Sequence, residues 1–176
     1  MTTTLRTHRL SAAPLSESGF AAYGVVLRSM PDGTPFTEAE AQLDVSGGTP
    51  RFYVMHLEDK APTFVGITRH LATTQTLMST RGEEWLIAVA PPAAADDDRP
   101  PALKDIEAFV VPGNVAITMR KGTWHAGPFF TEPSVDFANL ELSDTNVVDH
   151  HTYRLDREIG VQITIDLPSD LPGATS

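Results

Sequence analysis

The sequence predicts a mostly β protein in which many short strands form a sandwich or a small barrel, with a few short helices. From residue 51 onward the apolar residues fall in short runs, several of which alternate with polar residues. These runs are RFYVMHL, TFVGITRH, QTLMS, EWLIAVA, IEAFVV, VAITM, VDFANLEL and VQITIDL. Turn formers such as Pro112-Gly113 and Lys121-Gly122 separate them. Short strands at such close spacing are typical of sandwiches and barrels.

The first fifty residues are expected to be less regular. The stretch 14–27, PLSESGFAAYGVVL, predicts a short helix or turn with Ser16 as its N-cap, followed by a strand from Gly24. Residues 28–50 are rich in Gly, Pro and Ser, so we expect an irregular or briefly helical excursion there.

One domain is expected over residues 1–176, because a chain of this length buries one sizeable core but not two comfortable ones. The run 91–101, PPAAADDDRPP, is expected to be a solvated loop, since strand patterning resumes directly after it. The N-terminal residues and the tail after about Leu167 are expected to be flexible.

The composition narrows the classes of function. A formal charge of -10 argues against nucleic-acid binding, which depends on clustered Lys and Arg. No stretch is apolar enough to cross a bilayer, and the N-terminus lacks the apolar core of a secretory signal, so we expect a cytoplasmic protein without membrane contact. The chain has no cysteine, so any metal must be held by His, carboxylate or amide oxygen.

His70 and His125 are the first candidates for chemistry. On a strand, Thr68 and His70 share one face, whereas Arg69 points the opposite way. Gln75 can share the face of His70 only if a bulge or bend interrupts the residues between them. A lone histidine is more often a core imidazole than a ligand, so these residues become informative as an ordered set.

That order resembles the two-part signature of the cupin superfamily, whose small β-barrels carry His, His and Glu in the first part and His in the second. The matching positions are Thr68-x-His70-x4-Gln75, Gly82, Gly113 and Arg120-x-Gly122-x-x-His125. Thr68 stands where the superfamily has its first histidine, and Gln75 stands where it has the glutamate.

A closer resemblance, from about Phe20 to about Asp144, is to the ureidoglycolate lyase family. TRHLATTQTL at 68–77 is similar to the family's Glu-Arg-His-Pro-Leu-Gly-Ser-Gln-Ala-Phe, and EWLIAVAP at 84–91 to the strand that follows. GTWH at 122–125 is similar to its Val-Trp-His turn, and VDFANLE at 135–141 to its Thr-Asp-Phe-Leu-Thr-Ile-Asp. Departures from the family are Thr68 for Glu, Leu71-Ala72-Thr73 for Pro-Leu-Gly, and Ala126 for a second His.

The resemblance implies a cupin-like small β-barrel, or double-stranded β-helix, and a carbon-nitrogen lyase of the amidine-lyase type. The family converts ureidoglycolate, a small carboxylate, to glyoxylate and urea in purine and allantoin catabolism. The resemblance also implies a divalent metal, with nickel, zinc or manganese as candidates, and no organic cofactor. Related barrels dimerise by strand exchange, so a homodimer is expected.

Such a reaction requires a base for the hydroxyl proton, an acid for the departing nitrogen and a cation for the carboxylate. His125 and His70 are the candidate bases; alternatively, both hold a divalent metal together with Gln75. Arg51 is the first candidate for the cation, because its Arg-Phe-Tyr context resembles the family's Arg-Tyr-His. With His125 and His70 it completes the set of candidate catalytic residues. The other candidate cations are Arg69, Arg120 and Lys121.

Candidate substrate-binding residues are Arg51, Trp124, Lys121 and Asp136. Strand parity sends Asp136 and Glu141 to opposite faces, so at most one of them points inward. His56 and the pair His150-His151 are expected to be structural or to lie at the surface.

Two other classes of function stay open. The first is a non-catalytic or divergent cupin that binds a small carboxylate or sugar acid. The replacement of the superfamily's first His and its Glu favours this class. The second is a metal-dependent isomerase or dioxygenase, which would need a fuller set of strong ligands.

Overall fold

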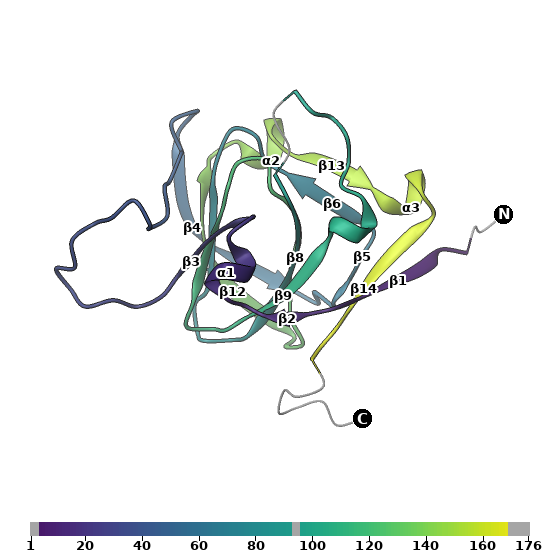
Figure 1. The fold of residues 1–176 in the computed structure, drawn as a ribbon, viewed down its shortest axis with the longest axis horizontal. Coiled ribbons are helices and arrows are strands. Elements are labelled where there is room, and N and C mark those ends of the chain that lie inside the picture. Colours follow the sequence, from purple (N-terminus) through teal and green to yellow (C-terminus); the bar gives the residue numbers. More distant parts are fainter. Residues whose placement is uncertain (1–3, 93–95, 169–176) are drawn as a thin grey trace.

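The computed structural model describes residues 4–92 and 96–168, and it confirms a mostly β architecture. Its strands form three sheets, with three short helices between strands (Figure 1). The arrangement is that of a cupin-like β-sandwich, and the described strands do not close into a single barrel. The tail expected to be flexible after Leu167 falls mainly on residues 169–176, which lie outside the described residues.

Two larger sheets and one small sheet contain the strands. The five-stranded sheet has the order β3-β10-β7-β12-β4, formed by Gly24–Leu27, Ala116–Met119, Gln75–Ser79, Ser134–Leu142 and Pro50–Glu58. The six-stranded sheet has the order β13-β6-β11-β8-β9-β2, formed by His151–Arg154, Gly66–Arg69, Trp124–Phe129, Trp85–Ala90, Glu107–Val111 and Ala13–Pro14. The three-stranded sheet has the order β1-β14-β5, formed by Arg6–Ser11, Val161–Asp166 and Thr63–Phe64.

The helices are single turns at the ends of strands. They are α1 (Glu17–Phe20), α2 (Thr145–Val148) and α3 (Leu155–Glu158), together with a 3-10 turn at Leu103–Asp105. The predicted N-cap is confirmed, because the Ser16 hydroxyl accepts a hydrogen bond from the Gly19 N–H at 3.0 Å. None of the helices in the described part of the chain is long and apolar enough to span a membrane.

Strand β8 lies at the centre of the molecule, and all six of its residues are buried. Trp85, Ile87 and Val89 join the core cluster that also contains residues of β3, β7, β10 and β12. The alternate residues Leu86, Ala88 and Ala90 join a second cluster that reaches β14 and β11. The uninterrupted apolar run of β8 therefore reflects a strand that is covered on both faces.

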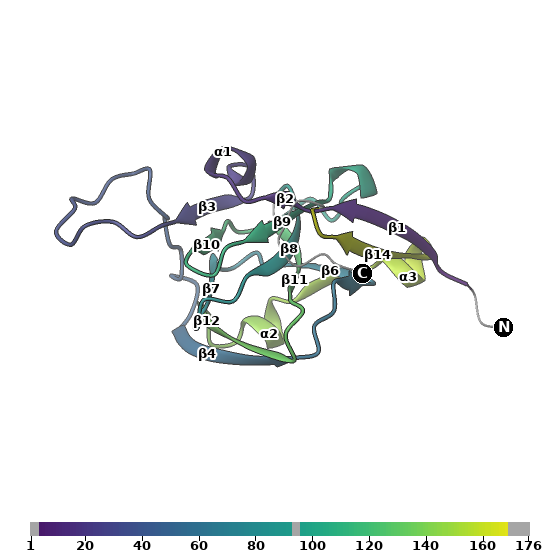
Figure 2. The ribbon, with the colours of Figure 1, turned by 90° about the horizontal axis from the view of Figure 1, so that it is seen from below.

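The long segment between β3 and β4 extends away from the sheets at one end of the molecule (Figures 1 and 2). It contains turns and no helix, which confirms the irregular excursion expected from its Gly, Pro and Ser. Strand β4 forms one edge of the five-stranded sheet and exposes Phe52 and Val54. A homodimer stays a prediction, and this apolar edge is the surface on which to test it.

Candidate functional site

A cavity of about 210 Å³ opens between the inner face of β4, β7 and β12 and the strand β11. Its apolar wall includes Met55, Leu57, Leu77 and Phe129. The polar residues that line it are Tyr53, Lys60, His70, Gln75, His125, Asn139, Glu141, Asn146 and His150. Polar groups therefore converge in one concave site, as they do in small-molecule pockets.

The structure brings His70 and His125 together in this cavity, with ring centroids 5.0 Å apart. His70 directly follows β6, and His125 is the second residue of β11, opposite Thr68 of β6. The turn before β11 fixes this approach, because the Gly122 N–H donates to the His70 carbonyl at 2.7 Å. Gly122 has a φ of 80°, a conformation in which a side chain would be strained.

A backbone carbonyl lies beside Nδ1 of each of the two imidazoles. The His70 Nδ1 is 2.5 Å from the Asp149 oxygen, and the His125 Nδ1 is 3.2 Å from the Thr123 oxygen. Because a carbonyl only accepts hydrogen bonds, Nδ1 carries the proton of each neutral ring, and Nε2 keeps its lone pair.

Burial keeps both rings neutral. It lowers the pKa of His125 to about 3, and the neighbouring His70 lowers this pKa further. Burial also lowers the pKa of His70, although the Asp149 carbonyl opposes the shift. At neutral pH each Nε2 can therefore accept a proton or coordinate a metal ion.

Glu141 is the buried carboxylate of the site and is 1% exposed. It accepts hydrogen bonds from the Tyr53 hydroxyl at 3.2 Å, the Asn146 amide at 3.3 Å and the Gln75 Nε2 at 2.9 Å. The Gln75 Nε2 also lies 3.3 Å from the Asn139 Oδ1. These two acceptors fix the orientation of the Gln75 amide, and its buried Oε1 has no hydrogen-bond partner among the described residues.

The chain matches the family described as ureidoglycolate lyase over residues 7–162. The chain belongs to the ureidoglycolate lyase family. A ureidoglycolate lyase of Azotobacter vinelandii is 26% identical over 136 residues, which cover 66% of this chain and 74% of that protein. A ureidoglycolate lyase of Escherichia coli O1:K1 is 22% identical over 160 residues, which cover 80% of this chain and 92% of that protein.

Within this ureidoglycolate lyase fold, four residues chosen from the sequence do not line the cavity. The Arg51 guanidinium lies outside it, 3.6 Å from the centroid of the Tyr53 ring. Lys121 forms an ion pair with Asp44. The other two are Asp136, which contacts the exposed His56, and Trp124, which lines a different hollow.

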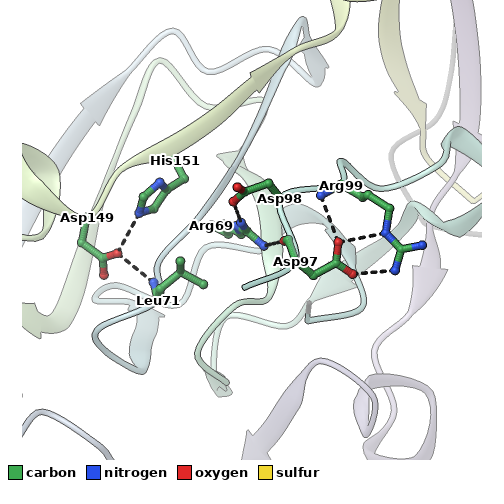
Figure 3. A network of polar contacts seen from close by, with 7 residues as sticks. All are labelled: Arg69, Leu71, Asp97, Asp98, Arg99, Asp149 and His151. Carbon is green, nitrogen blue, oxygen red and sulfur yellow. Dashed lines mark hydrogen bonds and ion pairs between the residues drawn. The ribbon is translucent and has the colours of Figure 1, made fainter. Parts of the chain in front are cut away.

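Trp124 and Arg69 pack against each other away from the cavity. The Arg69 guanidinium is 4.8 Å from the centroid of the Trp124 ring and donates to the Asp97 carbonyl at 2.7 Å (Figure 3). Trp124 lines a second hollow with Pro91, Pro92 and residues between 97 and 105, whereas residues 93–95 of the expected 91–101 loop lie outside the described residues. Arg69 therefore anchors Asp97 and Asp98, and it points away from the face of His70, as strand parity predicted.

Of the nine polar residues that line the cavity, sequence reasoning selected His70, Gln75 and His125 and did not select the other six, among them Lys60, Glu141 and His150. Parity allowed only one of Asp136 and Glu141 to face inward, and the structure places Glu141 there. The expectation that His150 is structural or lies at the surface is incomplete, because its ring lines the cavity and lies 5.7 Å from His70. No pattern marks Lys60, which follows a turn at Asp59 with a φ of 51°.

The outward position of Asp136 predicts a pH effect at His56. The Asp136 carboxylate lies 2.6 Å from the His56 Nδ1 and, with Glu58, raises the pKa of His56. A raised folded-state pKa stabilises the fold fully below the unfolded value near 6.5, and this contribution is lost as pH rises through the folded pKa. In Asp136→Asn, proton NMR titration should give a His56 pKa lower than in the wild type. An unchanged His56 pKa in this variant would contradict the pairing of Asp136 with His56.

Proposed function

We propose that the protein is a ureidoglycolate lyase, which cleaves the bond between the hydroxyl-bearing carbon and the ureido nitrogen and releases glyoxylate and urea. The observation that carries the proposal is the pair His70 and His125, two buried imidazoles that share the pocket of a ureidoglycolate lyase family member. Relatives that bear the name ureidoglycolate lyase support the choice of substrate.

His70 is the proton carrier of the proposed reaction. Its Nε2 takes the hydroxyl proton, the oxygen's electron pair forms the carbonyl of glyoxylate, and the carbon-nitrogen bond breaks. The departing nitrogen keeps the bonding pair, takes the proton from His70 and leaves as urea, so the ring returns to its neutral form. The Asp149 carbonyl at Nδ1 stabilises the protonated ring between the two transfers. His125 stays neutral, and its Nε2 accepts a hydrogen bond from the ureido group.

Alternatively, the same donors could hold a divalent metal such as nickel, zinc or manganese, in which case the two imidazoles would be ligands and not proton carriers. Nε2 of His70 and of His125 would be nitrogen ligands, and the unpartnered Gln75 Oε1 would be an oxygen ligand. When bound, the metal would polarise the substrate hydroxyl and lower its pKa. The described residues contain no group of three His, Asp or Glu side chains placed to hold a metal, so the amide oxygen is required in this donor set.

Lys60 is the cationic side chain of the cavity lining, and in this proposal it holds the substrate carboxylate. We expect Lys60→Ala to raise KM about 10- to 100-fold, because a charged hydrogen bond contributes about 1.5–3 kcal/mol. The kcat should change less, since the carboxylate is bound equally in the ground and transition states. Steady-state kinetics with ureidoglycolate measure both constants.

Lys121→Ala is the matched control for Lys60→Ala, because Lys121 is engaged by Asp44 outside the cavity. Its KM should equal that of the wild type. The opposite pattern, a raised KM in Lys121→Ala and an unchanged KM in Lys60→Ala, would assign the carboxylate to Lys121, one of the further cations that the sequence suggested after Arg51.

The proposed function is tested by glyoxylate release from ureidoglycolate. The assay uses the purified protein after chelation and again with added nickel, zinc or manganese. Turnover under either condition supports the lyase. If ureidoglycolate or another small carboxylate raises the melting temperature but is never converted, the protein is instead a binding cupin.

A further inference from the structure

Asp149 is an acidic residue that is only 5% exposed, and it lies between α2 and β13. Its two carboxylate oxygens accept hydrogen bonds from successive backbone N–H groups, Leu71 to Oδ1 and Ala72 to Oδ2, both at 2.8 Å. Its own carbonyl lies 2.5 Å from the His70 Nδ1. One residue therefore binds three consecutive positions of the segment that directly follows β6.

This segment lacks the support of a sheet. Strand β6 ends at Arg69 and β7 begins at Gln75, and the two strands belong to different sheets. Backbone N–H groups that are shielded from water require acceptors, and at the partly buried residues 71 and 72 the Asp149 carboxylate supplies them. Figure 3 shows this carboxylate between the Leu71 backbone and the His151 ring, whose Nε2 is 3.4 Å from Oδ1.

We propose that Asp149 is the positioning residue of His70: its carboxylate fixes residues 71 and 72, and its carbonyl fixes the ring as the Nδ1–H tautomer with Nε2 toward the cavity. The two contacts are coupled, because side chain and carbonyl belong to one residue. If the carboxylate is removed, the Asp149 N–H still donates to the Thr145 carbonyl at 3.1 Å, but no side-chain contact then ties the Asp149 carbonyl to the segment of His70, so the carbonyl can move away from Nδ1. The catalytic part of this inference rests on the proposed function, in which the His70 Nε2 carries the proton.

Asp149→Ala and Asp149→Asn are the test variants, and His151→Ala is the control. Alanine removes both acceptors, whereas asparagine keeps one oxygen and turns an amide N–H₂ toward the other N–H. His151→Ala removes only the half-exposed partner of the carboxylate. Long-range nitrogen-proton NMR of the histidine rings, assigned with His70→Ala, reads the tautomer of His70 directly. Kinetics with ureidoglycolate and thermal unfolding are measured on the same samples.

The wild type and His151→Ala should show His70 as a single neutral Nδ1–H tautomer. Asp149→Ala should show both tautomers and lose about 10- to 100-fold in kcat with little change in KM, as is usual when the partner that orients a functional histidine is removed. Asp149→Asn should give tautomer populations and a kcat between those of the wild type and Asp149→Ala. If the alanine variant does not fold, the asparagine variant tests the proposal in its place. A wild-type tautomer in a folded Asp149 variant overturns the proposal. A wild type that releases no glyoxylate overturns the proposed function instead, while the NMR result still tests the positioning role.

Discussion

Replacing His70 with alanine is expected to lower the kcat of glyoxylate release by about 10²- to 10⁴-fold, the range for loss of a general acid-base group. His70 lies in the cavity with its Nδ1 engaged by the Asp149 carbonyl, so its Nε2 is the nitrogen available to the substrate hydroxyl. Its low pKa keeps the ring neutral at pH 7, which is the form that takes the first proton. The KM should change little, because Lys60 and not His70 binds the carboxylate.

His56→Ala is the matched control, since this ring lies on the exposed face of β4 and contacts Asp136 instead of the cavity. Its kcat should equal that of the wild type. The expected loss in His70→Ala must occur without a loss of fold, so thermal unfolding of both variants is recorded with the kinetics. A folded His70→Ala variant with wild-type kcat would contradict the mechanism and transfer the proton-carrying role to His125 or His150.

The sequence predicted most of the strands because their apolar patterns are local. The run QTLMS corresponds to β7 from Gln75 to Ser79, and the run EWLIAVA to β8. The run TFVGITRH predicts one strand, but the structure divides it at Val65 into β5 and β6, which join different sheets. Strand β1, with only Leu10 among its apolar positions, carries no strand pattern. It exists because it pairs with β14, 155 residues away in the register.

The candidate site was predictable where its residues lie in ordered motifs and unpredictable where the fold brings in distant segments. His70, Gln75 and His125 meet because two motifs end at one cavity. Lys60 enters from the end of β4 and His150 from the segment after α2, and neither position has a motif of its own. Strand parity showed that at most one of the two acidic residues of β12 points inward, but it could not show which face of β12 lines the cavity.

Replacing Phe137 with alanine is expected to reduce the free energy of unfolding by about 3–5 kcal/mol, the usual cost of removing a buried phenylalanine. Phe137 is fully buried on β12, between β4 and β7. Its ring meets Trp85 edge-on with centroids 5.2 Å apart and lies 6.1 Å from Phe130. Trp85 belongs to the six-stranded sheet and Phe130 directly follows β11 of that sheet, so the Phe137 ring packs between the two large sheets, which cannot close easily over the space that it leaves. Urea unfolding at equilibrium gives the difference.

Phe52→Ala is the control, because Phe52 is 73% exposed on β4 and should change the free energy of unfolding by no more than about 0.5 kcal/mol. Phe137 also shares its face of β12 with Asn139 and Glu141, which line the cavity. A Phe137→Ala variant that still folds should therefore lose activity as well, since a relaxed β12 no longer holds Glu141 against Gln75. Equal stability losses in the two phenylalanine variants would show that the space between the sheets collapses freely. In that case the cavity would not depend on the rigid packing of β12.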